Sequence, residues 1–143
     1  MGRYQKPGFW RSLNQAWRGV WYTCRTQGHM QFHIAVGIAV LCLAWWSKVS
    51  RSEWLILIFA IGSVLSAEVV NSALEIIVDM VQPNFDPLAG MAKDVAAGAV
   101  LVTAVQAVVI GLIVFFPRFF RLLNYLFGGF HGLGFGFLIL GGH

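Results

Sequence analysis

Apolar residues dominate three long stretches of this chain, and a shorter amphipathic stretch precedes them. In residues 9–26, apolar side chains that include three tryptophans recur at steps of three and four residues, while Arg11, Arg18 and Arg25 fall on a different face. This pattern predicts a helix in the plane of a membrane surface, with tryptophan among the headgroups and arginine towards phosphates. Packing of the same helix on another protein is the alternative.

Each of the three apolar stretches is long enough to cross a bilayer. The first covers residues 29–47. The second covers residues 54–80, which at 1.5 Å per residue is about 40 Å and exceeds a hydrocarbon core of about 30 Å. The third is predicted to run from Pro87 to Phe116 and to end before Pro117. We therefore expect the last turns of the second helix, with Asp79, to reach the headgroups.

The polar turns between these stretches carry signals for the start of a helix. Ser50 or Ser52 is suited to cap the second span, with Glu53 favourably placed in its first turn. Asp86 is suited to cap the third span, with Pro87 at the first helical position. The sequence thus predicts an all-α integral membrane protein, in which an N-terminal amphipathic surface helix precedes three transmembrane helices and a tail rich in glycine and phenylalanine.

Composition and charge agree with this architecture. Hydrophobic residues make up 58% of the 143 residues and charged residues 11%, with a mean hydropathy of +0.72, which excludes an ordinary soluble domain. Five basic residues and no acidic residue precede the first apolar stretch, so the positive-inside rule places the N-terminus in the cytoplasm. A membrane surface, not nucleic acid, is the expected partner of this basic region. Cys24 and Cys42 indicate neither a disulfide framework nor a metal site.

Three parts follow from these patterns. Residues 1–28 are the cytoplasmic N-terminus with the surface helix, residues 29–117 the transmembrane domain, and residues 118–143 an apolar tail. Seven glycines lie among the 16 residues from Gly128 on, and this tail could follow the far interface, re-enter the membrane or span it weakly. We assign no chemistry to His131 or His143.

The second apolar stretch contains a row of polar residues. Because a helix turns by about 100° per residue, Glu68, Asn71, Glu75 and Asp79 fall within an arc of roughly 80°. A carboxylate inside a membrane is costly, so it faces a partner, a cavity or a ligand. A polar seam that only holds helices together is the alternative, although such seams more often use serine, threonine or asparagine.

The third stretch is predicted to place a cation opposite this row. Glu75 and Lys93 each lie nine residues from Asn84 in the connecting turn, so they should lie at similar depth on antiparallel helices. The result would be an acidic row on one helix and a lysine facing it on the next. A purely structural ion pair between Lys93 and Glu75 is the alternative.

Acids at graded depth beside a lysine suit phosphoryl transfer. Magnesium prefers oxygen ligands and often takes one or two carboxylates together with substrate phosphates, which suits Glu75 with help from Asp79. Lys93 would stabilise charge on the transferring phosphate, and Glu68 would accept the proton of the attacking hydroxyl. No P-loop and no protein-kinase signature is present. A proton- or ion-coupled carrier is the rival interpretation, since intramembrane glutamates also relay protons.

Two motifs carry a resemblance to a known family. They are A-E-V-V-N-S-A-L-E-I-I-V-D at residues 67–79 and P-L-A-G-M-A-K-D-V-A-A-G-A-V-L at residues 87–101, with W-R-G at residues 17–19. With them the chain resembles the prokaryotic diacylglycerol kinase and undecaprenol kinase family over roughly residues 9–117. The resemblance implies a homotrimer in the bacterial inner membrane, with active sites at subunit interfaces facing the cytoplasm. It also implies ATP and magnesium as cosubstrate and metal, and a lipid hydroxyl as acceptor.

The resemblance also implies a role for each residue of the motifs. Glu68 matches the catalytic base, Asn71 a supporting amide, Glu75 a metal-coordinating glutamate, and Lys93 a catalytic lysine on the ATP phosphates. The residues expected to contact the nucleotide are Arg18, Gln27, Asp79, Lys93 and Asp94.

This chain departs from the family pattern at three positions. Gln27 stands where the family usually has a glutamate that is the second metal ligand, and an amide oxygen binds magnesium more weakly. Asp86 replaces a histidine in the turn, and His29 replaces an asparagine or small residue. We therefore expect a lipid kinase, with undecaprenol favoured by the second motif and diacylglycerol as the alternative acceptor. A weakened or non-catalytic family member is the further alternative.

Overall fold

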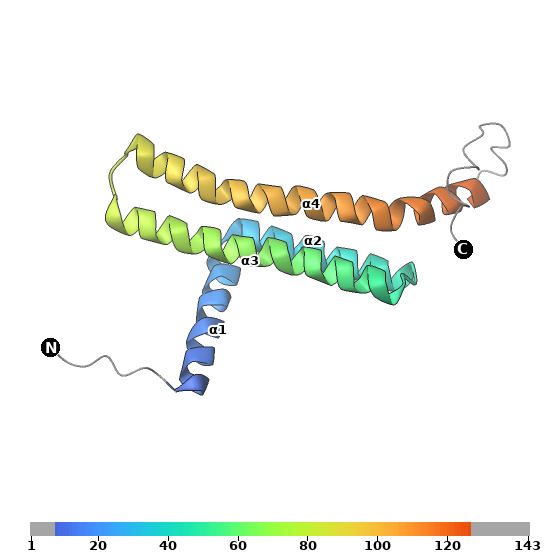
Figure 1. Ribbon diagram of the computed structural model, residues 1–143, viewed down its shortest axis with the longest axis horizontal. Coiled ribbons are helices and arrows are strands. Elements are labelled where there is room, and N and C mark those ends of the chain that lie inside the picture. The colour runs from blue at the N-terminus through green and yellow to red at the C-terminus, as the bar shows by residue number, and fades with distance from the viewer. Residues whose placement is uncertain (1–7, 127–143) are drawn as a thin grey trace.

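The computed structural model describes residues 8–126, which form four helices joined by short turns (Figure 1). Helix α1 (Phe9–Thr26) is the predicted amphipathic segment. Helices α2 (Gly28–Trp46), α3 (Arg51–Val81) and α4 (Pro87–Leu126) contain the three predicted spans, and each is long and apolar enough to cross a membrane. The predicted fold class is thus confirmed, while most of the predicted tail, including Gly128, His131 and His143, lies outside the described residues.

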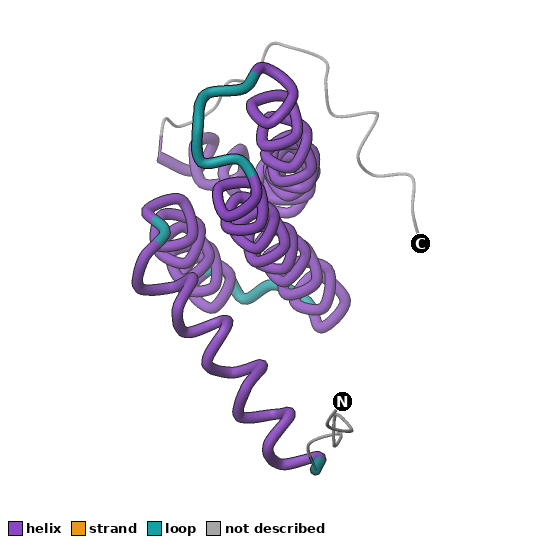
Figure 2. Tube along the Cα trace, turned by 90° about the vertical axis from the view of Figure 1, so that its left-hand side faces the viewer, coloured by secondary structure: helices purple, strands orange, loops and turns teal. Residues whose placement is uncertain are grey.

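Helices α2, α3 and α4 run alongside one another, and α1 leaves them crosswise (Figures 1 and 2). Helix α3 is the central element, because it packs on α4 along its length and on α2. Only Gln27 separates α1 from α2, so the chain changes direction within one residue. A helix that crosses the axis of a transmembrane bundle is oriented to lie along the membrane plane, and the exposed Trp10, Trp17 and Trp21 of α1 fit that position.

Helix α4 is longer than predicted. The sequence pattern placed its end at Phe116, but the helix continues through Pro117 to Leu126. Proline removes one backbone donor and usually kinks or ends a helix. Here the next residue strengthens the same turn, since Arg118 donates a side-chain hydrogen bond to the carbonyl of Val114 at 2.6 Å. This contact does not replace the hydrogen bond that Pro117 removes, which would have gone to the carbonyl of Ile113, but transmembrane helices contain proline more often than soluble helices do.

The two predicted caps are present. Ser50 and Glu53 form a reciprocal capping box at the start of α3, in which the Ser50 backbone N–H donates to the Glu53 carboxylate at 2.7 Å. Asp86 caps α4, because its Oδ1 accepts from the backbone N–H groups of Leu88 and Ala89 at 2.8 and 3.0 Å. These caps fix the residues at which α3 and α4 begin.

The buried face of α3 changes chemistry along its length. Its buried residues form one stripe that is apolar towards the N-terminal half and polar towards the C-terminal half: Leu57, Ala60, Val64, Glu68, Asn71 and Ser72. Leu57, in the apolar half, packs in a cluster with Ala44, Val49 and Val114. Close packing with α2 occurs at Gly37, where an added Cβ would lie 3.1 Å from Ile61 Cγ2. The face that forms the core therefore also carries the candidate chemistry.

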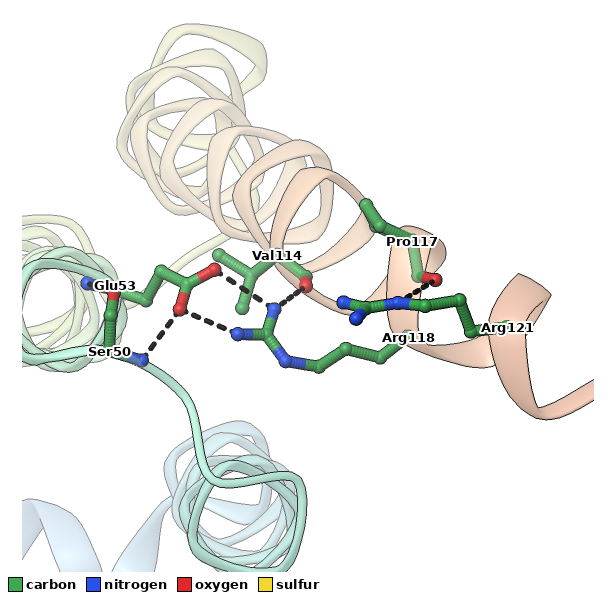
Figure 3. Close-up of polar contacts among 6 residues, drawn as sticks. All are labelled: Ser50, Glu53, Val114, Pro117, Arg118 and Arg121. Carbon is green, nitrogen blue, oxygen red and sulfur yellow. Dashed lines mark hydrogen bonds and ion pairs between the residues drawn. The ribbon is translucent and has the colours of Figure 1, made fainter. Parts of the chain in front are cut away.

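The end of the bundle away from the acidic row is closed by an ion pair. Both oxygens of the Glu53 carboxylate accept hydrogen bonds from the Arg118 guanidinium, at 2.9 and 2.7 Å (Figure 3). This bidentate contact joins the first turn of α3 to α4 just beyond Pro117. The hairpin of α3 and α4 is thus held at this end by a polar contact as well as by apolar packing.

Candidate active site

The deepest acidic residue lies on the buried face of α3. Glu68 is 3% exposed and Asn71 is 6% exposed. Ser72 lies on the same face and donates its hydroxyl to the backbone carbonyl of Glu68 at 2.9 Å, which satisfies the hydroxyl without using the Glu68 carboxylate. Among the described residues no side chain forms a hydrogen bond with that carboxylate, so it stays free to meet a ligand.

Exposure rises along the predicted row towards the α3–α4 turn. Glu75 is half-buried, and its Oε1 accepts a hydrogen bond from Asn71 Nδ2 at 3.1 Å. The side chain of Asp79 is 63% exposed. The order Glu68, Glu75, Asp79 thus runs from the protein interior to the surface, on one face of one helix, as the sequence pattern predicted.

Lys93 does not form the ion pair with Glu75 that the spacing of the two residues about the turn had left open as the purely structural alternative. Its ammonium group forms an ion pair with Asp79 instead. Counting residues from the turn predicts depth, but it does not give the rotation of each helix about its own axis, and that rotation selects the partner. The lysine faces the acidic row from the neighbouring helix, as predicted, and its partner Asp79 lies one helical turn from Glu75 towards the α3–α4 turn.

The remaining candidate residues lie apart from this network. Gln27 is half-buried at the junction of α1 and α2, whereas Arg18 on α1 and Asp94 on α4 are exposed. Within residues 8–126 no hydrogen bond or ion pair joins any of these three side chains to Glu68, Glu75 or Lys93. The structure therefore joins Asn71 to Glu75 and Lys93 to Asp79, and it shows no polar contact between these pairs and the other three side chains.

Asn71 carries a feature that sequence reasoning did not find. Its Oδ1 is buried and has no hydrogen-bond partner among the described residues. A buried unsatisfied acceptor costs about 1–3 kcal/mol, so such atoms in native proteins call for an explanation, and a ligand donor is one. The sequence pattern showed that Asn71 faces inward with the acids, but not which of its two polar atoms would be left without a partner.

The donor chemistry of the site suits magnesium. Glu75 and Asp79 supply carboxylate oxygens, which magnesium prefers. Within the described residues no group of three or more histidine, cysteine, aspartate and glutamate side chains could enclose a metal. Magnesium is commonly held by one or two carboxylates together with water and substrate phosphates, so this sparse set fits that ion better than it fits zinc.

Most of this chain is similar in sequence to known proteins. Residues 14–115 match the family model described as prokaryotic diacylglycerol kinase. Undecaprenol kinase of Bacillus subtilis (strain 168) is 44% identical over 110 residues, which are 77% of this chain and 89% of that protein. Diacylglycerol kinase of Synechocystis is 36% identical over 120 residues, 82% of this chain and 67% of that protein. Diacylglycerol kinase of Escherichia coli (strain K12) is 31% identical over 110 residues, 77% of this chain and 84% of that protein.

Proposed function

This chain belongs to the prokaryotic diacylglycerol kinase family and is a membrane lipid kinase, and we propose that it transfers the γ-phosphate of ATP to the hydroxyl of undecaprenol. Undecaprenol is proposed as the acceptor because sequence identity is 44% to the relative named undecaprenol kinase. Identity to the relatives named diacylglycerol kinase is 36% and 31%. Diacylglycerol is the alternative acceptor.

The gradient of burial along α3 is the observation that carries this proposal. From Asp79 to Glu75 and from Glu75 to Glu68 the axial distances are about 6 Å and about 10 Å at 1.5 Å per residue. ATP comes from water and a lipid alcohol comes from the membrane, so a site joining them needs groups at both depths. Asp79 and Lys93 lie where a nucleotide can arrive, and Glu68 lies where a lipid hydroxyl can arrive.

Glu68 acts as the general base in this proposal. The lipid oxygen attacks the γ-phosphorus, the bond from that phosphorus to the bridging oxygen breaks, and ADP leaves. The hydroxyl proton passes to the Glu68 carboxylate. Asn71 positions Glu75 through its amide nitrogen and has a free Oδ1 that can accept a hydrogen bond from a bound ligand.

Lys93 binds the phosphates of ATP in this proposal. Its ion pair with Asp79 is largely exposed, with side chains 35% and 63% accessible, and exposed pairs contribute about 0–1 kcal/mol. The lysine can therefore exchange the carboxylate for phosphate oxygens at little cost. Arg18, Gln27, Asp79 and Asp94 complete the proposed set of nucleotide contacts.

We assign the magnesium ion to Glu75, with Gln27 as a weaker second ligand. When bound, magnesium neutralises phosphate charge and orients the γ-phosphate. A homotrimer with active sites between subunits would bring further groups to a site that one chain leaves open. The basic residues of α1 favour a cytoplasmic N-terminus, and with it an active site on the cytoplasmic side of a bacterial inner membrane.

The test of this proposal is a direct comparison of acceptors. Purified protein in mixed micelles receives radiolabelled ATP with undecaprenol, with diacylglycerol, or with both at equal concentration. We expect labelled lipid phosphate in every case and preference for undecaprenol in the mixture. Phosphorylation of neither lipid would contradict the proposal, and preference for diacylglycerol would replace the acceptor while keeping the reaction.

A weakened enzyme is the second candidate, and Gln27 is the observation that favours it. An uncharged amide offsets less of the metal charge than a carboxylate does, so Gln27→Glu should raise the rate and lower the magnesium concentration needed for half-maximal rate. A magnesium titration of both proteins measures this. An unchanged half-maximal concentration would show that Gln27 does not limit metal binding.

A further inference from the structure

Two polar side chains face outward in the middle of the transmembrane hairpin. Ser66 on α3 and Gln106 on α4 are both exposed, amid apolar residues on either side along each helix. Neither side chain forms a hydrogen bond within the part of the chain that the structure describes, although Ser63, Ser72 and Thr103 nearby donate to backbone carbonyls. The proposed catalytic site does not use either residue.

The two ion pairs of the hairpin give the depth of these residues. Ser66 lies thirteen residues from Glu53 and thirteen from Asp79, and Gln106 lies thirteen from Lys93 and twelve from Arg118. Each is therefore about 20 Å from the ion pair at either end. The ion pairs are roughly 39 Å apart along α3, which exceeds a hydrocarbon core of about 30 Å. Ser66 and Gln106 thus share one depth, at the centre of the membrane.

The side-chain amide of Gln106 needs a hydrogen-bond partner at this depth. Acyl chains offer no hydrogen-bond donor or acceptor, and an unsatisfied polar group in hydrocarbon costs several kcal/mol. A serine hydroxyl can bond to the carbonyl four residues earlier on its own helix, but a glutamine side chain has no comparable local partner. Gln106 is also turned roughly 80° from the line of Ala96, Val100 and Val114, through which α4 is buried. Its own chain therefore does not cover it.

We propose that Gln106 of one copy of this chain forms a hydrogen bond with Ser66 of a neighbouring copy, where α4 of the first packs on the outer face of α3 of the second. The bilayer holds all copies at one height, so a residue at the membrane centre can reach only partners at the same depth, and Ser66 is such a partner. The amide and the hydroxyl can each donate and accept. Gly62, one turn from Ser66, has open space where a Cβ would stand, so the approaching helix can come close.

This contact joins two different surfaces of the chain, so repeating it about an axis normal to the membrane gives a ring when the rotation between copies closes. It goes beyond the proposed kinase activity and does not depend on it. The proposed homotrimer is one such ring, and the contact assigns to it a pair of residues. Loss of phosphoryl transfer and loss of this contact are therefore separate experimental outcomes.

Cysteine cross-linking tests the contact directly. In a background carrying Cys24→Ser and Cys42→Ala, chains with Ser66→Cys and one tag are mixed in membranes with chains carrying Gln106→Cys and a second tag, and a lipophilic oxidant is added. We expect a disulfide-linked dimer that carries both tags. The matched control replaces Gln106→Cys with Val105→Cys, which lies at nearly the same depth on a different flank of α4 and should cross-link far less.

The result is read without ATP or lipid substrate, so it is independent of the kinase reaction. A two-tag dimer in the Gln106 mixture and not in the Val105 mixture supports the contact, whether or not the protein phosphorylates lipid. Equal cross-linking in both mixtures, or none in either while the protein still runs as an oligomer, would overturn it.

Substitution at Gln106 gives a second measurement. Gln106→Leu should weaken association of the copies by roughly 3- to 30-fold for each hydrogen bond lost, measured by dissociation in increasing detergent. Val105→Leu is the control and should leave association unchanged. Unaltered association of the Gln106→Leu protein would show that the amide faces lipid, and it would contradict the proposal.

Discussion

At the scale of single residues, Asn71 joins the interior of α3 to the candidate active site. Its Nδ2 donates to Glu75, and its buried Oδ1 has no partner among the described residues. A residue kept only for stability would not leave a buried acceptor unsatisfied, because that atom costs about 1–3 kcal/mol. Substitution of Asn71 by an apolar residue should therefore lower activity without lowering the stability of the fold.

We predict that Asn71→Leu lowers the rate of lipid phosphorylation by about 10- to 100-fold, since Glu75 loses the group that positions it. The fold should keep its stability or gain some, because the substitution removes the unsatisfied acceptor and adds apolar contact. Kinetic assays and thermal unfolding of the same preparations measure both effects. Equal losses of activity and of thermal stability would indicate a structural role only.

The residue scale is also where the sequence was least informative. Helical periodicity placed Glu68, Asn71, Glu75 and Asp79 on one face, because rotation along a single helix is fixed by spacing alone. The partner of Lys93 depends on how α3 and α4 are rotated relative to each other, and spacing along the chain does not give that rotation. The pairing of Lys93 with Asp79 therefore could not be predicted from spacing alone.

At the scale of helices, local sequence signals predicted most of what the structure contains. The capping box at Ser50, the cap at Asp86 and the extent of α1 follow from a few neighbouring residues each. The predicted end of α4 before Pro117 was wrong. The helix beyond Pro117 is supported by a contact between Arg118 and Glu53, which lie 65 residues apart in the chain. Such a contact has no local signature.

The ion pair between Glu53 and Arg118 should contribute to the stability of the α3–α4 hairpin. We predict that Arg118→Met lowers the free energy of unfolding by about 1–3 kcal/mol, because it leaves a half-buried carboxylate without its bidentate partner. Unfolding in mixed micelles with increasing denaturing detergent measures the change.

Arg121→Met is the matched control for this prediction. Arg121 is exposed, and among residues 8–126 its side chain bonds only to the carbonyl of Pro117, at 3.5 Å (Figure 3). Its substitution should change stability by less than about 0.5 kcal/mol. Similar losses in both variants would mean that the bidentate contact adds nothing beyond the general effect of removing a charge.

At the scale of the whole molecule, one chain leaves most of its apolar surface uncovered. Only 6% of the most apolar window of α4 is buried within the chain, compared with 33% for α3. Lipid covers apolar side chains without cost, but it offers no hydrogen-bond partner to Gln106 and no further groups to the proposed nucleotide site at Glu75 and Lys93. Composition and periodicity predicted three spans and a surface helix, but they did not predict which surfaces of neighbouring copies meet.

Glu68, the proposed acceptor of the proton of the lipid hydroxyl, is the residue on which the proposed reaction depends most directly. The decisive measurement compares the parent protein with Glu68→Gln, a change that keeps the shape of the side chain and removes its charge, in ATP-dependent phosphorylation of undecaprenol and in binding of ATP. We predict that the turnover rate falls by about 10²- to 10⁴-fold while ATP binding is kept, because the base lies on the lipid side of the site. A turnover rate within a few fold of the parent, with ATP bound equally well, would contradict this role for Glu68.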